Sequence, residues 1–142
     1  MLTSARNQLS GKVSAIARGA VNDEVAITLA DGQVIVAMLT HSSTESLGLQ
    51  VGSDAFALIK ASSMILLTDT AGIKLSTRNQ LTGSITGLVN GAVNAEVVLT
   101  LASGTVITAM ITNDSVDNLG LAVGGTATAA FKASSVIVGV KA

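Results

Sequence analysis

The sequence predicts an all-β protein: two tandem five-stranded β barrels, each with one short helical turn. The first observation is a repeat, because the chain shifted by 72 residues overlays itself from Ser4–Thr70 onto Ser76–Ala142 without a gap. The second is that each copy consists of short runs rich in Val, Ile and Thr, bounded by Gly, Asn and Asp. Two copies are too few for a solenoid, so we expect each repeat to close on itself and pack against its twin. The predicted modules are residues 1–68 and 76–142, joined by a linker at 69–75.

The first half of each module predicts three strands. Residues 8–19 form the first expected strand, interrupted by Gly11. Residues 22–40 form an expected hairpin that turns at Asp31-Gly32, where glycine supplies the positive φ of a tight turn. The second copy has Ser103-Gly104 at that place.

The second half predicts the helical turn and two more strands. Residues 42–49 read as the turn, with a capping box of Ser42 and Glu45. Residues 51–67 read as two strands broken near Lys60. Five strands and one turn in so short a module favour a Greek-key barrel of the oligonucleotide-binding type, a label that describes topology only.

Composition excludes several function classes. The net charge is −1, so no basic field favours nucleic acid or an anionic membrane, and Phe56 and Phe131 are the only aromatic residues. Without cysteine, disulfides and thiolate sites are excluded. The single histidine, His41, excludes a histidine-built metal site within one chain.

The apolar content is high for a small protein. Mean hydropathy is +0.63 and 12% of the residues are charged. One small chain has too much surface to hide this much apolar side chain, so we expect an obligate homo-oligomer. The apolar runs are too short to span a bilayer, and the first residues contain no signal-peptide core, so we expect a cytoplasmic protein without a membrane partner.

The repeat also filters candidate functional residues, because a role needed in both copies requires both residues. Four of the eight basic residues match: Arg6 with Arg78, and Lys60 with Lys132. His41 becomes Asn113, and Glu24 and Glu96 are the only identical acidic match. No repeated acid–base pair or catalytic triad can be built, so we expect a protein that is not an enzyme and holds no metal cation or nucleotide.

The remaining matched polar residues are nearly all hydrogen-bond donors. An arginine, a lysine and several hydroxyls with no matched carboxylate nearby suit a small oxyanion, preferably a dianion. The donors of the first copy are Ser4, Arg6, Asn7, Gln8, Thr40, Ser43, Lys60, Ser62 and Ser63.

Each of these residues has a purely structural alternative. Arg6 and Arg78 can pair with Glu24 or Glu96, and the two lysines can be solvated strand ends. Ser62 and Ser63 can be turn residues, and Thr40 and Ser43 can cap the helical turn. The segment "GAVN" reads as a tight turn, Met38 and Met110 as core residues, and His41 as a surface residue.

Three short motifs, in order and twice, resemble the signature of the molbindin (Mop) family of small molybdate-binding modules. They are "SARNQL" with "STRNQL", "MLTHSS" with "MITNDS", and "KASSMI" with "KASSVI". The resemblance covers almost all of the chain and implies a tandem two-module molbindin, assembled as a trimer. Molybdate or tungstate would bind between modules, with Ser4 and Arg6 on one side and the other donors on a neighbouring module.

The resemblance implies the following anion-binding residues: Ser4, Arg6, Thr40, Ser43, Lys60, Ala61 and Ser62 in the first copy, and Ser76, Arg78, Thr112, Ser115, Lys132, Ala133 and Ser134 in the second. A second kind of site, lined largely by backbone, would fall on Ala20, Val21, Asn22, Ala92, Val93 and Asn94. Asp114, which replaces Ser42, puts a carboxylate beside the second-copy ligands.

The implied function is intracellular molybdenum storage and homeostasis. The alternative is a molybdate-sensing regulatory module whose loaded state is recognised by a partner. An enzyme of the molybdenum cofactor pathway and a structural shell protein are weaker hypotheses. The first lacks matched acids and histidine pairs, and the second leaves the repeated Arg and Lys unexplained.

Overall fold

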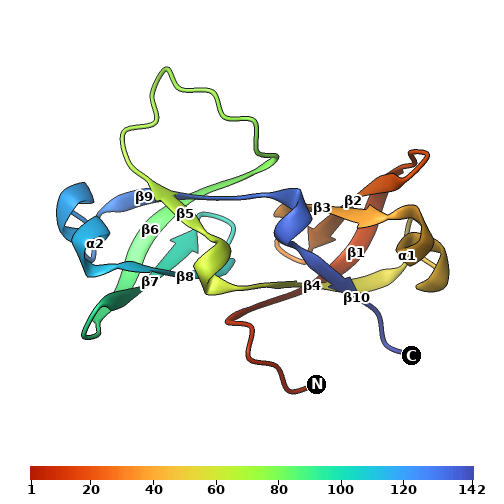
Figure 1. Ribbon diagram of the computed structural model, residues 1–142, viewed down its shortest axis with the longest axis horizontal. Helices are drawn as coiled ribbons and strands as arrows, with labels where there is room; N and C mark the ends of the chain where they lie inside the picture. The colour runs from red at the N-terminus through yellow and green to blue at the C-terminus, as the bar shows by residue number, and fades with distance from the viewer. The chain divides into compact units, whose positions relative to one another are not determined.

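A computed structural model describes all 142 residues, and the chain forms two compact units (Figure 1). Unit 1 contains Met1–Ile59 together with Lys132–Ala142. Unit 2 contains Lys60–Phe131. Each unit therefore draws on both sequence repeats.

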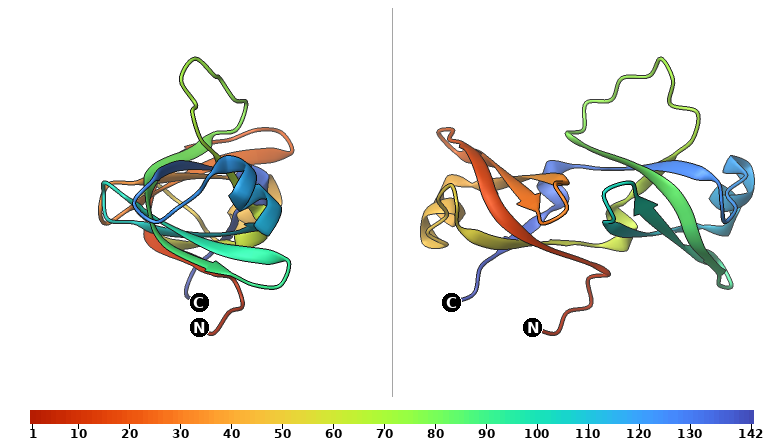
Figure 2. Two further views of the ribbon diagram at one scale, coloured as in Figure 1. Left: turned by 90° about the vertical axis from the view of Figure 1, so that its left-hand side faces the viewer. Right: turned by 180° about the vertical axis from the view of Figure 1, so that it is seen from behind.

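Unit 1 is a five-stranded antiparallel sheet in the order β10-β4-β1-β2-β3. The outer strands β3 and β10 also lie against each other, so the sheet curls toward a barrel. The long strand β1 curves across the unit, as the rear view shows (Figure 2). The elements are β1 (Asn7–Ala17), β2 (Asn22–Leu29), β3 (Val34–Thr40), α1 (His41–Ser46), β4 (Asp54–Ile59), the 3-10 turn η2 (Ala133–Ser135) and β10 (Ile137–Gly139).

Unit 2 repeats this arrangement in the order β5-β9-β6-β7-β8. The fold-class prediction is confirmed: the chain is all-β, with five strands and one short helix in each half. The elements are the 3-10 turn η1 (Ala61–Ser63), β5 (Ile65–Leu67), β6 (Asn79–Asn90), β7 (Asn94–Leu101), β8 (Val106–Thr112), α2 (Asn113–Leu119) and β9 (Thr126–Phe131).

The two repeats exchange their last strands. β10 comes from the second repeat and pairs with β4 of the first, and β5 comes from the first repeat and pairs with β9 of the second. The expectation that each repeat closes on itself was wrong. Both last strands follow the same pattern, so the pattern predicts a strand without saying which sheet it joins.

Gly11 does not interrupt the first strand but lets it pack closely on its neighbour. A Cβ at Gly11 would overlap the carbonyl oxygen of Thr28 on β2. In unit 2 a Cβ at Gly83 would lie 2.6 Å from the carbonyl oxygen of Thr100. Both contacts are far shorter than a side chain tolerates, so glycine is required at this position in both units.

The hairpin turns follow the prediction, but one core assignment does not. Gly32 and Gly104 have φ of 92° and 103°, the left-handed conformation expected of glycine in a tight turn. Met38 and Met110 were expected in the core, and this was wrong, because they are 42% and 37% exposed. Along β3 the buried face belongs to Ile35 and Ala37 instead.

Candidate functional site

The predicted anion-binding residues of unit 1 lie at two opposite ends of its sheet. Arg6 precedes Asn7, which begins β1 and pairs with Ile59 at the end of β4. Thr40 ends β3 and pairs with Asn22, beside the far end of β1. Since β1 has 11 residues, the two ends are on the order of 30 Å apart at the usual rise of about 3.3 Å per residue. Figure 1 shows α1 and the β1–β2 turn together at one end of this unit.

The first end carries the cationic residues. Arg6 comes directly before the rung that pairs Asn7 with Ile59, and Lys60, which follows Ile59 in the sequence, is the first residue of unit 2. The 3-10 turn η2, whose N-cap is Lys132, leads into β10 beside β4. The buried amide of Asn7 holds this end together, because its Nδ2 donates to the carbonyl oxygen of Ile59 at 3.2 Å.

The same end of unit 2 has the same construction. Arg78 precedes Asn79, which pairs with Phe131, the residue before Lys132. The turn η1, whose N-cap is Lys60, leads into β5 beside β9. Each arginine therefore shares its unit with the "KASS" turn of the other repeat.

The "KASS" turns have the same exposure in both units. Ala61 and Ala133 are buried, whereas the lysines and Ser62 and Ser134 are exposed. The backbone N–H of Ser63 donates to the carbonyl oxygen of Lys60 at 3.0 Å, which confirms a turn role for this segment. The first N–H groups of such a turn have no partner within it.

The second end carries paired hydroxyls. The side chain of Thr40 accepts from the backbone N–H of Ser43 at 3.1 Å, and the two hydroxyl oxygens lie 2.8 Å apart. Thr112 and Ser115 do the same at 3.1 and 2.9 Å. The predicted capping box of Ser42 and Glu45 was wrong, since Thr40 is the N-cap and α1 begins at His41. Two hydroxyls that share one hydrogen bond keep one O–H able to donate outward.

The "GAVN" segments are tight turns fastened to the helices. The backbone N–H of His41 donates to the carbonyl oxygen of Val21 at 2.8 Å, and Asn113 does the same to Val93. The Val21 and Val93 side chains are 73% and 67% exposed. The tight-turn interpretation is confirmed. Four residues of the predicted second site, Ala20, Val21, Ala92 and Val93, lie on these exposed turns, and Asn22 and Asn94 are the exposed first residues of β2 and β7.

Sequence reasoning missed a histidine–carboxylate pair next to Thr40, in which the carboxylate is buried. Asp23 is 1% exposed, and its carboxylate lies 3.0 Å from His41 Nδ1 and accepts from the backbone N–H of Gly19 at 2.9 Å. Burial raises the pKa of Asp23, but hydrogen bonds from Gly19, Thr44 and His41 outweigh it, and the net pKa is lowered. His41 is therefore a half-buried bridge, with Nε2 3.0 Å from Glu45, rather than a plain surface residue.

Unit 2 replaces this pair with a single amide. Ala95 stands in the place of Asp23, and Asn113 Nδ2 donates to the carbonyl oxygen of Gly91 at 2.8 Å. Because only matched residues passed the repeat filter, Asp23 was discarded. The sequence could have indicated Asp23, because the alternation of the strand that follows the turn places this residue on the inward-facing side.

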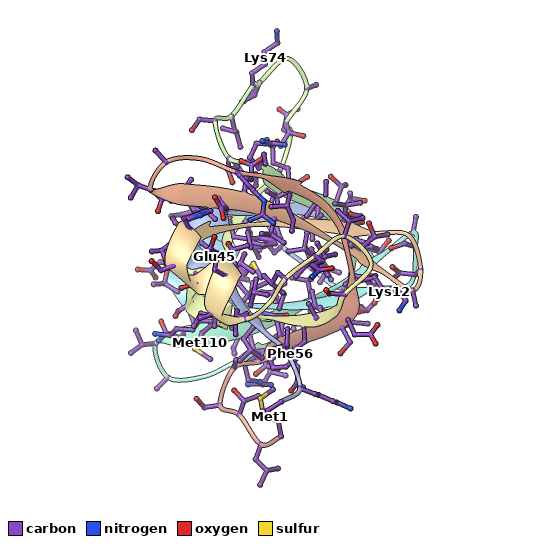
Figure 3. The ribbon with its side chains drawn as sticks, turned by 90° about the vertical axis from the view of Figure 1, so that its right-hand side faces the viewer. Met1, Lys12, Glu45, Phe56, Lys74 and Met110 are labelled. Carbon is purple, nitrogen blue, oxygen red and sulfur yellow. The ribbon has the colours of Figure 1, made fainter.

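A hollow of about 880 Å³ opens on unit 1, lined in part by Lys12, Asp54, Phe56 and Lys141. Lys12 Nζ and Asp54 Oδ1 form an exposed ion pair at 2.6 Å. None of the predicted anion-binding residues lines it, and Figure 3 shows Lys12 and Phe56 well apart from Glu45 on α1. Unit 2 has Ser84, Thr126 and Thr128 in place of Lys12, Asp54 and Phe56, so this hollow is not the repeated candidate site.

The helices all fall short of the length and apolarity that a membrane span requires. Nowhere do three or more His, Asp or Glu side chains gather as a group that could hold a metal ion.

The two modules are now recognisable by their sequence family as well. The TOBE domain matches the chain twice, at residues 3–66 and 75–138. The chain belongs to the TOBE-domain family. The tandem organisation and the resemblance to Mop modules are thereby confirmed. The two TOBE matches follow the sequence repeats, whereas the compact units follow the exchanged strands.

Curated relatives of this TOBE pair have names connected with molybdenum. The chain is 51% identical over 141 residues to the molybdenum transport protein ModE of Herbaspirillum seropedicae, covering 99% of this chain and 52% of that protein. It is 45% identical over 138 residues to the molybdenum-pterin-binding protein MopA of Rhodobacter capsulatus, covering 97% of this chain and 52% of that protein. The chain thus spans about half the length of the curated relatives it matches.

A solved structure matches the TOBE pair over its whole length. It is that of the cytoplasmic molybdate-binding protein ModG with molybdate bound, 48% identical, with a TM-score of 0.95. The match covers 99% of this chain and 100% of that one. At this identity and coverage the match confirms the fold of both modules.

Proposed function

We propose that this tandem TOBE protein binds molybdate, and tungstate, as intact oxyanions and serves as an intracellular molybdenum store. It acts in the cytoplasm as a binding protein without catalysis. The oxyanion is the bound species, and no metal cation, nucleotide, nucleic acid or membrane takes part. The names of the relatives and the molybdate held by ModG support this choice of anion.

One observation carries the proposal: each unit holds cationic donors at one end of its sheet and hydroxyl donors at the other. A single unit therefore offers only half of a donor shell at either end. We infer that the cationic end of one chain meets the hydroxyl end of another and that the anion lies where they meet. A shell of Arg, Lys, hydroxyl and backbone N–H donors satisfies all four oxygens of a tetrahedral dianion.

The proposed shell combines the two kinds of ends. Thr40 or Thr112 with its serine supplies the hydroxyls, and the arginine and the "KASS" turn supply the charge and backbone donors. A second, weaker kind of site is proposed at the "GAVN" turns. The proposed anion-binding residues are Ser4, Arg6, Thr40, Ser43, Lys60, Ala61, Ser62, Ser76, Arg78, Thr112, Ser115, Lys132, Ala133 and Ser134.

The proposed assembly is a homotrimer. Matched apolar side chains support association, because both units expose the same strand faces: Val34 and Met38 on β3 correspond to Val106 and Met110 on β8. Ile137 and Ile65, both 63% exposed, extend these faces onto β10 and β5. Apolar side chains repeated at matched positions favour a contact between copies over scattered surface exposure.

Selectivity follows from the donor chemistry. Phosphate near neutral pH carries a proton that needs an acceptor, and a shell of donors leaves that proton unpaired. Sulfate is a dianion like molybdate but has shorter bonds, so the size of the shell must exclude it. We expect molybdate and tungstate to bind, sulfate weakly, and phosphate least.

Equilibrium dialysis of the full chain with molybdate, sulfate and phosphate tests the proposal. Arg6→Ala should weaken one class of molybdate site roughly 10- to 100-fold, because a charge-assisted hydrogen bond is lost. Arg18→Ala is the matched control, since Arg18 is an exposed arginine whose counterpart is Asn90. Equal binding of molybdate and sulfate, or equal effects of the two substitutions, would rule out the proposed site.

A regulatory role is the second candidate. The curated relatives contain this pair of TOBE domains within proteins about twice as long. In such a role the loaded pair would be recognised by a partner. Pull-downs from the native host with and without molybdate separate the two roles, because a storage protein needs no partner that depends on the anion.

A further inference from the structure

Each exchanged strand is held to its neighbour by only three rungs. β10 and β5 are the outermost strands in their sheet orders, and each also contacts the strand at the other edge of its sheet, β3 or β8, so backbone pairing alone gives few side chains that could choose between them. The rungs in unit 1 are Ile137 with Leu58, Val138 with Ala57 and Gly139 with Phe56; those in unit 2 are Ile65 with Ala130, Leu66 with Ala129 and Leu67 with Thr128.

At the third rung, the larger side chain is on the receiving strand in unit 1 and on the exchanged strand in unit 2. In unit 1 the large side chain is Phe56 on β4, and the strand that joins it has Gly139. A Cβ at Gly139 would lie 3.0 Å or less from three atoms of the Phe56 ring, so the ring covers the glycine backbone. In unit 2 the large side chain is Leu67 on the joining strand, opposite the smaller Thr128. An aromatic ring across from an edge glycine is a known way of stabilising such a rung.

We infer that these two rungs select which last strand completes which unit. If β5 instead paired with β4, Leu67 would stand opposite Phe56, and the ring would have to rotate off the sheet into water. If β10 paired with β9, Gly139 would stand opposite Thr128 and leave a gap where Leu67 now packs. Both incorrect pairings lose apolar contact, so the exchange is favoured in both units.

The remaining two rungs do not discriminate. Ile65 and Ile137 are identical, and Leu66 and Val138 both face an alanine. The connection does not discriminate either, because the five residues between β4 and β5 are within the range of ordinary hairpin loops. A repeat that closes on itself is therefore a real competitor, and the third rung is where the two topologies differ.

Disulfide trapping can report the topology, since the chain has no cysteine of its own. Leu58→Cys with Ile137→Cys reports the exchanged pairing, because these residues are register partners. Leu58→Cys with Ile65→Cys reports a self-closed repeat, because Ile65 holds the place of Ile137 in the first copy. Register partners in an antiparallel ladder have Cα atoms about 4.5–5.5 Å apart, within reach of a disulfide.

The two reporters are compared in three backgrounds. The first is the natural sequence. The second is F56T/T128F, which transposes the two side chains at unchanged composition and makes both exchanged rungs mismatched. The third is F56T/T128F/L67G/G139L, which restores complementary rungs with their sizes inverted.

In the natural background we expect a within-chain disulfide from the exchange reporter and none from the self-closure reporter. In F56T/T128F the amount of disulfide formed by the exchange reporter should fall about tenfold. Overpacking in one unit and lost contact in the other shift the equilibrium from the exchanged to the self-closed topology. The disulfide of the self-closure reporter should then appear. The quadruple variant F56T/T128F/L67G/G139L should again form the disulfide of the exchange reporter and not that of the self-closure reporter.

An unchanged exchange product in F56T/T128F would overturn the inference. A disulfide between chains in that background would also overturn it, because the exchanged strand would still be chosen despite the mismatch. If circular dichroism shows that F56T/T128F does not fold, the quadruple variant F56T/T128F/L67G/G139L tests the inference instead. Recovery of its fold supports the inference, and failure to recover overturns it.

Discussion

The imidazole of His41 bridges two carboxylates, with Nδ1 3.0 Å from buried Asp23 and Nε2 3.0 Å from exposed Glu45. Asp23 in turn accepts the backbone N–H of Gly19, so the pair ties the start of α1 to the turn before β2. In unit 2 Asn113 makes the corresponding link directly to Gly91. Two different side-chain sets therefore fix the same turn beside the two threonine caps.

Removing the buried carboxylate should destabilise unit 1. In Asp23→Ala, the Gly19 N–H and His41 lose their acceptor, and we expect the melting temperature to fall by several degrees. The double variant D23A/H41N copies the Ala95 and Asn113 of unit 2 and should recover part of the loss. Recovery should be incomplete, because the buried Oδ1 of Asn113 has no hydrogen-bond partner in its own unit. Thermal unfolding followed by circular dichroism measures the melting temperatures of the natural protein and the two variants. A double variant no more stable than the single one would contradict the prediction.

The lowered pKa of Asp23 predicts an acid-dependent contribution. A carboxylate with a folded-state pKa below its ordinary 3.8 stabilises the protein above that value, and the contribution is lost as the pH falls through the lowered pKa. The stability difference between the natural protein and Asp23→Asn should therefore be constant at neutral pH and shrink below about pH 4. Urea unfolding across this range measures it, and a difference that grows on acidification would be inconsistent with the lowered pKa.

Gly11 should resist substitution more than another glycine in a matching strand. An added Cβ meets a backbone carbonyl at Gly11, but only the Val98 side chain, at 3.3 Å, at Gly87. Gly11→Ala should cost about 1–3 kcal/mol, and Gly87→Ala clearly less, because a side chain moves more easily than a paired strand. Ser10→Ala, an exposed neighbour, is the control. Chemical denaturation of the three variants would disprove the packing argument if they were equally stable.

Asp114 should weaken the second class of anion site. It lies in the first turn of α2 beside Thr112 and Ser115, where the first repeat has Ser42. Asp114→Ser should tighten molybdate binding severalfold, since two exposed charges at close range interact by about 1 kcal/mol in water. Ser42→Asp should weaken the first class by a similar factor. Calorimetric titration at low and high salt checks both, and effects that do not diminish with salt would argue against electrostatics.

The exposed methionines should be needed for assembly. A charge at each of Met38 and Met110 would be buried without a partner in a contact between copies, so M38E/M110E should release monomers. V51E/V123E is the matched control, because these valines are 67% and 63% exposed and lie outside the strands. Light scattering distinguishes monomers from the assembled protein. Equal behaviour of the two double variants would exclude this face from the interface.

Much of the fold could be predicted because each strand and turn has a local cause. The alternation along β2 and the Gly32 turn follow directly from residue patterns. The exposure of Met38 could not be predicted, because alternation does not say which face of β3 is covered. The exchanged strands could not be predicted either, because β5 and β10 have the same pattern and differ mainly in Leu67 and Gly139.

The candidate site was predicted as residue types rather than as an arrangement. The repeat filter found Arg6 and Thr40, but only the register revealed that they lie at opposite ends of one sheet. The same filter removed Asp23, because its counterpart is Ala95. A comparison of matched positions finds the residues that both repeats share. It misses an interaction, such as that of Asp23 with His41, that only one repeat contains.

The exchanged strands also determine what happens when the chain is cut. A protease acting between Asp69 and Leu75 would leave β5 attached to the first fragment and β10 attached to the second. Each fragment would still fill the open sheet edge of the other, so the nick would not release two independent halves. Either fragment made alone would have an unpaired edge at β4 or β9, to be filled by a strand of another molecule or by its own last strand in the mismatched pairing. The tandem arrangement thus keeps the borrowed strand within the same polypeptide, at a concentration that dilution does not change.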